Sequence, residues 1–425
     1  MNSFTKSARG GSGLDADVLV VGAGPGGSST AYHLARQGAD VLMVDKALFP
    51  REKVCGDGLT PYGVRALQRL GVDPHEPGFI PAYGLRTYGI DGLVLDLPWP
   101  HRSGFPQLGV VRTRYEFDHL LAMRAEKAGA RFLQGVEAAA PLIEGGWVSG
   151  ATLKENGNSW EVRARFVVAA DGASSRFAQQ AGVTRDATRP LGIAARRYYR
   201  IPRPHQPVLE AFLNLWDEPT GGIMAGYGWI FPLGEGVVNV GAGLLNTFKR
   251  FKEVSARKLM DQFLGDLPPE WGINEENAIG PTLSGPIPMG MNRRPLAVPG
   301  LLLVGDAGGL VNPFNGEGIA YAIETGELAA ELLGDALARN RPAVAHMYPT
   351  LVRQRYGRYY TIGTKWVRLI GHPQFMKFCV KYGFPRQTLM RFAIGVMANM
   401  AGGPGGGTGD KMMRALLRMV PEGSR

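Results

Sequence analysis

Three glycines and one carboxylate near the start of this chain have the spacing of a dinucleotide-binding turn. Gly22, Gly24 and Gly27 form the pattern G-x-G-x-x-G, and Asp45 follows at the end of the next apolar run. Such glycines allow a tight turn, close approach of the backbone to a pyrophosphate, and close packing of a helix on a strand, while the acid accepts from a ribose hydroxyl. The pattern predicts a bound dinucleotide. The alternative is a glycine-rich turn that binds nothing.

A second set of candidates combines one thiol with three aromatic rings. Cys55 lies in a loop beside Gly56, and Tyr227, Trp229 and Phe231 alternate along the chain. Alternate residues of an extended strand share one face, and the π-faces of aromatic rings can stabilise a developing cation. The thiol is a candidate for reaction chemistry and the rings for lining a pocket. The alternatives are a small buried cysteine and ordinary aromatic core packing.

The glycine pattern requires a strand before it and a helix after it. Residues 16–21 form an apolar run apart from Asp17, and residues 28–37 are predicted to form a helix. Residues 41–44 are a second apolar run that ends at Asp45. The positive N-terminal end of this helix would point at the phosphates. The order of strand, turn, helix, strand and acid predicts a β-α-β unit.

Two later segments repeat the step from an apolar strand into a polar turn. Residues 301–304 lead into Gly305-Asp306, followed by the turn at 312–318, and residues 166–170 lead into Asp171-Gly172. Together with the first turn, these elements resemble the FAD-binding fold of flavin hydroxylases. In that fold the first turn holds the diphosphate and the late Gly-Asp pair holds the ribityl chain. The resemblance implies FAD as the cofactor, since a NAD dehydrogenase would lack the late element.

Three further segments resemble a more specific group. Residues 50–61 (PREKVCGDGLTP), 227–232 (YGWIFP) and 312–318 (NPFNGEG) are similar to motifs of the geranylgeranyl reductase family, and most similar to the menaquinone reductases of actinobacteria. The resemblance spans roughly three quarters of the chain. It implies an FAD-dependent reductase that saturates a carbon-carbon double bond of a polyprenyl chain, with menaquinone as the expected substrate. The reaction would add a hydride from the flavin and a proton.

The resemblance also implies roles for individual residues. Cys55 would orient the alkene or deliver the proton, and Tyr227, Trp229 and Phe231 would line the isoprenoid groove. Arg114 matches an arginine that contacts FAD in related flavoproteins; the alternative is a surface cation at a helix start. The expected cofactor-binding residues are Gly22, Gly24, Pro25, Gly26, Gly27, Asp45, Lys46, Cys55, Gly56, Arg114, Asp171, Gly305, Asp306, Gly316 and Gly318.

Other functions remain open at this point. A flavin-dependent monooxygenase acting on a hydrophobic substrate would leave few marks in the sequence, and geranylgeranyl diphosphate or a prenylated lipid presents the same alkene as menaquinone. A flavin halogenase would show a W-x-W-x-I-P segment, which the sequence lacks. A prenyl-binding protein without flavin chemistry would lack the glycine turn. We expect no metal site, because no histidine pair has ligand spacing.

The expected fold class is α/β: a Rossmann-like FAD-binding domain of the flavin-hydroxylase type, an inserted antiparallel β-sheet domain for the substrate, and a helical C-terminal region. We expect residues 1–15 to be a disordered tail. The FAD-binding domain would comprise residues 16–80, 106–190 and 286–340, and the substrate domain residues 81–105 and 191–285. Helices are expected near residues 114–127 and 316–339. No separate NADPH domain is visible, so NAD(P)H would bind transiently or another carrier would supply electrons.

The net charge of +10 is concentrated in the last fifth of the chain. Residues 341–425 contain 14 Lys and Arg against Asp410 and Glu422, a net +12, so the first 340 residues carry −2. This segment is also rich in Met and aromatic residues, which favours helices on an anionic membrane surface. The alternative is a set of helices that only caps the core. With two cysteines and no nucleic-acid motif, we expect a cytoplasmic protein, peripherally associated with the inner face of the membrane, that binds no nucleic acid.

Overall fold

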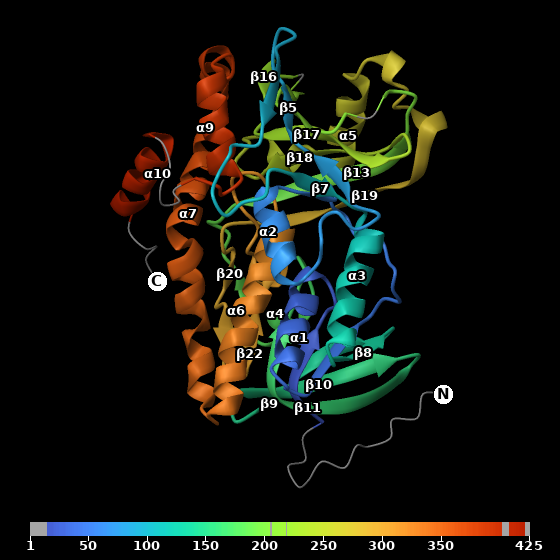
Figure 1. The fold of residues 1–425 in the computed structure, drawn as a ribbon, viewed down its shortest axis with the longest axis vertical. Helices are drawn as coiled ribbons and strands as arrows, with labels where there is room; N and C mark the ends of the chain where they lie inside the picture. Colours follow the sequence, from blue (N-terminus) through green and yellow to red (C-terminus); the bar gives the residue numbers. More distant parts are fainter. Residues whose placement is uncertain (1–14, 205, 218, 402–407, 421–425) are drawn as a thin grey trace.

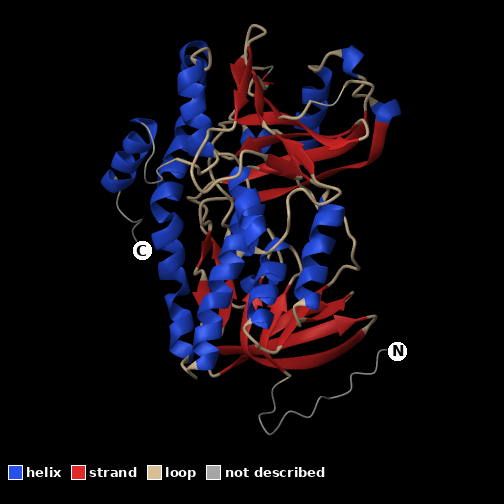
Figure 2. Cartoon of the chain, viewed as in Figure 1, coloured by secondary structure: helices blue, strands red, loops and turns tan. Residues whose placement is uncertain are grey.

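Two large β-sheets and a long helical layer make up most of this protein, as Figures 1 and 2 show. The computed structural model describes residues 15–204, 206–217, 219–401 and 408–420. The expected tail, apart from Asp15, and the glycine-rich segment 402–407 lie outside the described residues. No helix within the described ranges is long and apolar enough to cross a membrane.

The first sheet has eight strands in the order β21-β22-β11-β1-β2-β8, with β10 and β9 extending β11 as an antiparallel ribbon. The pairs from β22 to β8 are parallel. Since parallel strands share a direction, their carboxyl ends meet at one edge, where ligands bind in open α/β sheets. Its strands are β1 (Ala16–Val21), β2 (Val41–Asp45), β8 (Arg131–Gln134), β9 (Glu137–Glu144), β10 (Trp147–Glu155), β11 (Asn158–Ala169), β21 (Ala297–Val298) and β22 (Leu301–Leu303).

Both faces of this sheet are buried, which explains the continuous apolar runs of its central strands. Val18 and Val20 of β1 pack toward the helices, whereas Leu19 and Val21 pack toward the β9–β10–β11 ribbon. The helical side holds α1 (Pro25–Arg36), α2 (Pro61–Arg69), α3 (Arg114–Lys127) and α6 (Ile319–Ala338). At the start of α3 the Thr113 side chain accepts a hydrogen bond from the N–H of Glu116 at 3.3 Å and so caps the helix.

The second sheet has seven strands in the order β19-β13-β18-β17-β14-β5-β6, antiparallel except for β14 with β5. One face packs against α5 (Ala256–Gly265), with Ile230 and Phe263 in that core. The other face turns toward the first sheet's helices and loops (Figure 1). Its strands are β5 (Gly84–Tyr88), β6 (Val94–Pro98), β13 (Leu191–Arg200), β14 (Leu209–Phe212), β17 (Gly226–Gly234), β18 (Val237–Leu245) and β19 (Ala278–Pro288).

Several short elements complete the described fold. A three-stranded sheet joins β3 (Gly58–Leu59), β7 (Gly109–Val111) and β4 (Ile80–Ala82). Two-stranded pairs join β12 (Thr184–Arg185) to β20 (Arg293–Arg294) and β15 (Trp216–Asp217) to β16 (Gly222–Ile223). A short helix, α4 (Arg176–Gln180), follows the turn after β11. The described structure has the expected α/β class, with strands that lie between parts of the FAD-binding region in the sequence forming the second sheet.

The C-terminal region is helical and runs along the whole molecule. It comprises α7 (Tyr348–Ile370), α8 (Pro373–Phe378), a π-helical turn at Cys379–Gly383, α9 (Gln387–Met397) and α10 (Thr408–Met419). In Figure 1, α7 lies beside α6 and leads to α9 at the top, next to the second sheet. Met390 and Ile394 of α9 share an apolar cluster with Leu97 and Trp99. The C-terminal helices therefore bridge the two sheets.

A buried carboxylate fixes α7 to the first domain. Glu324 of α6 accepts hydrogen bonds from Tyr356 of α7 at 2.7 Å and from Arg69 of α2 at 2.9 Å, and also from Tyr62. Burial alone would raise the pKa of Glu324, but Arg355 and these donors lower it below its ordinary value. The charged form is therefore the stable one here, and it ties three helices together.

Two helix starts differ from the expectation. The first helix begins at Pro25 rather than residue 28, because proline fits the first turn of a helix, where no N–H partner is needed. The late helix begins at Ile319 rather than residue 316, and Gly316 has a φ of +79°. Residues 316–318 thus form the turn before the helix, with its N-terminal end still adjacent to them.

Candidate active site

A continuous cavity of about 1390 Å³ runs from the carboxyl edge of the first sheet, past the inner face of the second, to the C-terminal helices. Every residue predicted to bind cofactor or act on substrate lines it except Gly27. A Cβ atom on Gly27 would lie 1.8 Å from the carbonyl oxygen of Gly22. Gly27 therefore serves the packing of α1 on β1, behind the wall of the cavity.

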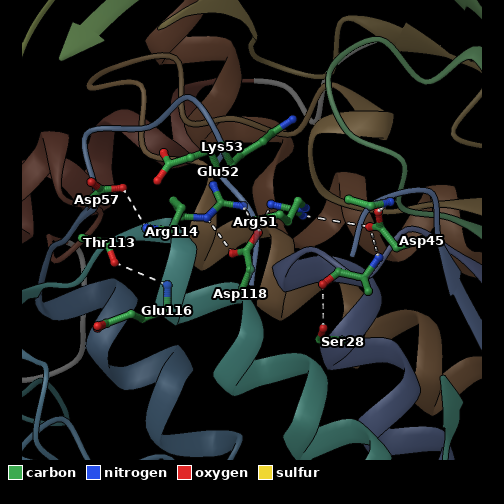
Figure 3. Close-up of polar contacts among 12 residues, drawn as sticks. Ser28, Asp45, Arg51, Glu52, Lys53, Asp57, Thr113, Arg114, Glu116 and Asp118 are labelled. Atoms are coloured by element: carbon green, nitrogen blue, oxygen red, sulfur yellow. Dashed lines mark hydrogen bonds and ion pairs between the residues drawn. The ribbon is translucent and has the colours of Figure 1, made fainter. Parts of the chain in front are cut away.

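The turn after β1 forms one end of this cavity. Gly22 has a φ of +100°, and a Cβ there would lie 2.4 Å from the carbonyl oxygen of Ala170. Gly24 precedes α1, whose first N–H groups receive no side-chain cap. Asp45 supports the turn, accepting from the N–H of Ala23 and of Ala47, each at 2.9 Å (Figure 3). The open N–H groups and the helix N-terminus form an anion-binding end.

An ion cluster that the motif analysis missed lies next to this turn (Figure 3). Arg114 donates to both carboxylate oxygens of Asp118, at 2.6 and 2.7 Å, and Arg51 contacts the same carboxylate at 2.8 Å. Asp118 is fully buried. The spacing of Arg114 and Asp118, four residues apart on one helix, is a sequence signal that could have indicated the pair. The predicted cofactor contact Arg114 is thus held rigidly by its own helix.

Charged residues from other strand ends complete this part of the wall. Asp171 follows β11 and accepts from Ser175 at 2.7 Å, so its carboxylate also fixes the start of α4. Asp306 lines the cavity after β22, and burial raises its pKa while Lys53 opposes that rise. Burial lowers the pKa of Lys53 in turn. Lys46, predicted from the same turn as Asp45, also lines the cavity.

The loop that carries Cys55 lies directly over the aromatic strand. A Cβ on Gly56 would lie 3.2 Å from Cε2 of Phe231 and 3.3 Å from Nε1 of Trp229, so glycine allows this approach. Tyr227, Trp229 and Phe231 line one wall of the cavity from β17, as their alternation predicts. Burial raises the pKa of the Cys55 thiol, while the nearby Arg114 guanidinium opposes the rise. The thiol is therefore protonated at neutral pH, with a cation beside it.

One buried amide connects the thiol loop to the aromatic strand. Asn239 of β18 donates to the carbonyl oxygen of Cys55 at 2.8 Å and to Asp57 at 2.7 Å, and accepts from Nε1 of Trp229 at 2.9 Å. Asp57 also accepts from the hydroxyl of Tyr198 at 2.8 Å. Burial raises the pKa of Asp57 to about 6.

Neither Asn239 nor Asp57 was predicted from the sequence. Asn239 is fully buried between Val238 and Val240, and a polar residue inside an apolar strand is the signal that could have indicated it. Asp57 has a φ of +65° and lies between Gly56 and Gly58. An acid held in that conformation, which few non-glycine residues adopt, marks a constrained loop.

The turn before α6 forms another part of the cavity wall. Tyr227 donates to the carbonyl oxygen of Asn315 at 2.8 Å, which joins the aromatic strand to this turn. Glu317 points away toward α2, where its carboxylate accepts from the Thr60 hydroxyl at 2.9 Å. Burial raises the pKa of Glu317 to about 7. Glu317 therefore precedes α6 and fixes the start of α2.

These residues fit FAD. The uncapped N-terminus of α1 with the Gly22 turn suits a diphosphate, and Asp306 offers an acceptor open to the cavity for a hydroxyl chain. The cavity volume of about 1390 Å³ exceeds the 300–1,000 Å³ typical of a small-ligand pocket, so a dinucleotide and a second ligand have room together. No cluster of metal-ligating side chains is found among the described residues.

Comparisons with known proteins agree with this site. A family model described as "FAD binding domain" matches residues 15–198. The menaquinone reductase of Mycolicibacterium smegmatis is 38% identical over 385 residues, covering 91% of this chain and 92% of the relative. The digeranylgeranylglycerophospholipid reductase of Thermoplasma volcanium is 33% identical over 348 residues, covering 80% and 84%.

Solved structures show the same architecture. A geranylgeranyl bacteriochlorophyll reductase-like protein from Thermoplasma acidophilum has a TM-score of 0.76 and 27% identity, covering 94% of this chain and 99% of that one. The flavin-dependent brominase Bmp2 has a TM-score of 0.70 at 19% identity and shows the fold alone.

The fold and the site define an FAD-dependent oxidoreductase of the flavin-hydroxylase architecture. With relatives above 30% identity over most of its length, the chain belongs to the geranylgeranyl reductase family. The family, fold class and cofactor expected from the sequence motifs are confirmed. The roles of individual site residues stay predictions.

Proposed function

We propose that this enzyme saturates one double bond in the isoprenoid chain of menaquinone. The observation that carries the proposal is the continuity of the cavity: the nucleotide-binding turn, the thiol loop with its aromatic strand, and the C-terminal helices share one space. Menaquinone is favoured among prenyl substrates by the relatives named menaquinone reductase at 38% identity.

The reaction adds a hydride and a proton across an unactivated trisubstituted alkene. FAD held at the Gly22 turn and Asp306 would, when reduced, supply the hydride. The Cys55 S–H bond breaks to give the proton to one alkene carbon, and the second carbon, with tertiary cation character, accepts the hydride. Arg114 beside the sulfur stabilises the resulting thiolate.

The aromatic strand positions the alkene and stabilises its charge. Trp229 is held by its hydrogen bond to Asn239, so its ring plane is fixed before substrate arrives. Tyr227 is held by Asn315 in the same way. Fixed rings cost little reorganisation when cation character develops, and their π-faces attract it. The second carbon of the alkene would develop its charge against this wall.

A prenylated ether lipid is the second candidate substrate. Relatives named digeranylgeranylglycerophospholipid reductase are 33% identical over 80% of this chain. Such a lipid presents the same trisubstituted alkenes as menaquinone. Mass spectrometry distinguishes the two candidate substrates because it measures both quinones and prenyl lipids.

The test is mass spectrometry of quinones and lipids from cells lacking this gene, complemented by variants. The intact gene should restore a menaquinone heavier by two hydrogens, Cys55→Ser should not, and Cys379→Ser should. Cys379 is the matched control because it also lines the cavity, from the π-helical turn. Purified Cys55→Ser should keep its FAD.

Three results would contradict parts of this proposal. An unchanged quinone profile with altered prenyl lipids would move the substrate to the second candidate. Substrate-dependent oxygen consumption would indicate a monooxygenase. Near-normal turnover by FAD-loaded Cys55→Ser would remove the thiol from the proton-transfer step.

A further inference from the structure

The cavity reaches the molecular surface at the junction of α8 and α9. Residues 369–391, here called the mouth segment, contain the end of α7, α8, the π-helical turn and the start of α9. Cys379, Phe384 and Leu389 of this segment line the cavity. Leu389 is at the same time 45% exposed to solvent. One side chain thus belongs to both the cavity wall and the outer surface, which places an opening here.

Exposed apolar side chains are concentrated around this opening. Of the twelve large hydrophobic residues exposed in the described part of the chain, four lie in the mouth segment: Leu369 at 44%, Phe378 at 58%, Tyr382 at 47% and Leu389 at 45%. The rings of Phe378 and Tyr382 pack together, with centroids 5.2 Å apart. Clustered exposure of this kind marks an interaction site, whereas scattered exposed apolar residues are ordinary.

The same surface is positively charged. The exposed cations of the segment are Lys377, Lys381, Arg386 and Arg391. Residues 371–400 contain no Asp or Glu. The Nζ atom of Lys381 lies 5.4 Å from the centroid of the Tyr382 ring, so positive charges and apolar side chains alternate on this surface. This combination is the signature of segments that lie in the interface of an anionic bilayer.

The inner face of the segment is already occupied. Met376 packs with Ile223, and Met390 packs with Leu97 and Trp99 of the second sheet region. The exposed rings and cations therefore belong to the outer face, and the inner face anchors the segment to the second sheet region. An interface with the bilayer would leave these inner contacts in place.

We propose that the mouth segment docks on an anionic lipid bilayer and admits an isoprenoid chain from the membrane directly into the cavity. The docking follows from charge and exposed apolar area, and its link to catalysis rests on the proposed function. A long isoprenoid chain would then move from one apolar environment to another without crossing water.

The test is co-sedimentation of the FAD-loaded enzyme with vesicles of phosphatidylcholine alone or with 30% phosphatidylglycerol. The variants are Lys377→Glu with Lys381→Glu, and Phe378→Ser. We expect strong binding only to the anionic vesicles, weakened by salt, and a loss of about tenfold or more in binding for each variant. One matched control combines Lys252→Glu, just before α5, with Lys258→Glu on α5. The other is Ile143→Ser on β9, where the Ile143 side chain is 51% exposed. The controls should bind like the native enzyme.

Activity assays in detergent micelles and on anionic vesicles test the docking surface and the proposed reaction separately. The mouth variants should reduce menaquinone in detergent micelles at the native rate and lose turnover on menaquinone embedded in anionic vesicles. Native-like vesicle binding by both mouth variants, or equal losses in the controls, would overturn the docking surface and leave the reaction intact. Normal docking by an enzyme without activity on menaquinone in either format would overturn the proposed substrate and leave the surface intact.

Discussion

At the residue scale, the site depends on buried polar groups that hold reactive or substrate-facing ones. The side chain of Asn239 forms direct hydrogen bonds with the Cys55 backbone, the Asp57 carboxylate and the Trp229 indole. Arg114 is fixed by Asp118 and lies beside the thiol. Each of these holders is fully or nearly fully buried. A buried polar group without its hydrogen-bond partner costs free energy, so these buried side chains restrict the reactive groups to one arrangement.

Replacing Asn239 by leucine should therefore impair turnover more than FAD binding. The change removes both donors and the acceptor, and we expect kcat to fall on the order of 10²-fold because the thiol and the ring lose their fixed positions. Flavin absorbance and steady-state kinetics measure the two effects. Asn246→Leu is the control, since Asn246 accepts only from the backbone N–H of Leu191.

The pH profile of Asn239→Leu distinguishes positioning from general destabilisation. With one donor gone, the pKa of Asp57 should rise further above about 6. A kcat profile identical in shape to that of the native enzyme, with full activity, would rule out the positioning role.

Glu317 should make the protein less stable as pH rises toward neutrality. Its pKa is raised from 4.5 to about 7 in the folded state, so the folded protein binds the proton more tightly than the unfolded chain. The contribution of Glu317 to the free energy of unfolding should be fully present below pH 4.5 and be lost as the pH rises through the folded pKa, by about 3 kcal/mol in total at roughly 1.4 kcal/mol per unit.

Thermal unfolding of FAD-loaded protein between pH 4 and 8 measures this loss, with Glu317→Gln as the comparison. Asp57, raised to about 6, contributes a similar fall at lower pH in both proteins. Because the Asp57 contribution is common to both proteins, the two stability curves should diverge between pH 4.5 and 7, where only the native protein loses the Glu317 contribution. Parallel curves through that window would show that the Glu317 carboxyl is not protonated in the folded enzyme.

At the element scale, the strand ends of the first sheet and the inner face of β17 create the two halves of the site. Gly22, Asp45, Asp171 and Gly305 each follow or end a strand of the sheet, and the parallel register brings them to one edge. The strand period turns Tyr227 toward the cavity and Ile230 toward the α5 core. Both effects come from regular backbone geometry.

Gly22→Ala should abolish FAD binding. A Cβ at this position would lie 2.4 Å from the carbonyl oxygen of Ala170, so either the turn or the neighbouring strand must move. Gly38→Ala is the matched control: its φ is +84°, but nothing lies within 4 Å of its Cβ. The control should lose about 1–2 kcal/mol of stability from backbone strain and keep its FAD. Stoichiometric flavin in purified Gly22→Ala would contradict the clash.

At the scale of the whole molecule, the cavity lies among three parts of the fold, and the C-terminal helices form its far wall. Residues from the first sheet, the second sheet and α7 to α10 all line it. Ligands that fill the cavity therefore add contacts between these parts. Stability and cofactor content should be coupled.

Removing FAD should lower the melting temperature, and adding it back should restore stability in proportion to its saturation. At a free FAD concentration 100 times Kd the gain is about 2.7 kcal/mol. Differential scanning fluorimetry of the apoprotein against FAD and FMN measures it. FMN should give the smaller shift, since it lacks the adenosine part that Asp45 and the adjoining wall would contact. Equal shifts would exclude a role for that end of the cavity.

The sequence by itself determined the local parts of this protein. Backbone geometry and residue spacing predict four of these parts. They are the glycine turn, the acid at the end of β2, the helix Arg114–Lys127 and the shared face of the three aromatic residues. The family motifs led from there to the FAD cofactor and the fold class. Each of these signals is contained within a few tens of residues.

Only the tertiary structure decided which distant residues meet. Asn239 bonds to Cys55 and Asp57 across separations of 184 and 182 residues, and Glu317 bonds to Thr60 across 257. The C-terminal helices, whose composition indicated only basic and apolar character, form the far wall of the cavity. Such contacts depend on sheet register and on how the two sheets face each other. Those are properties of the packed whole and leave no periodic trace in the chain.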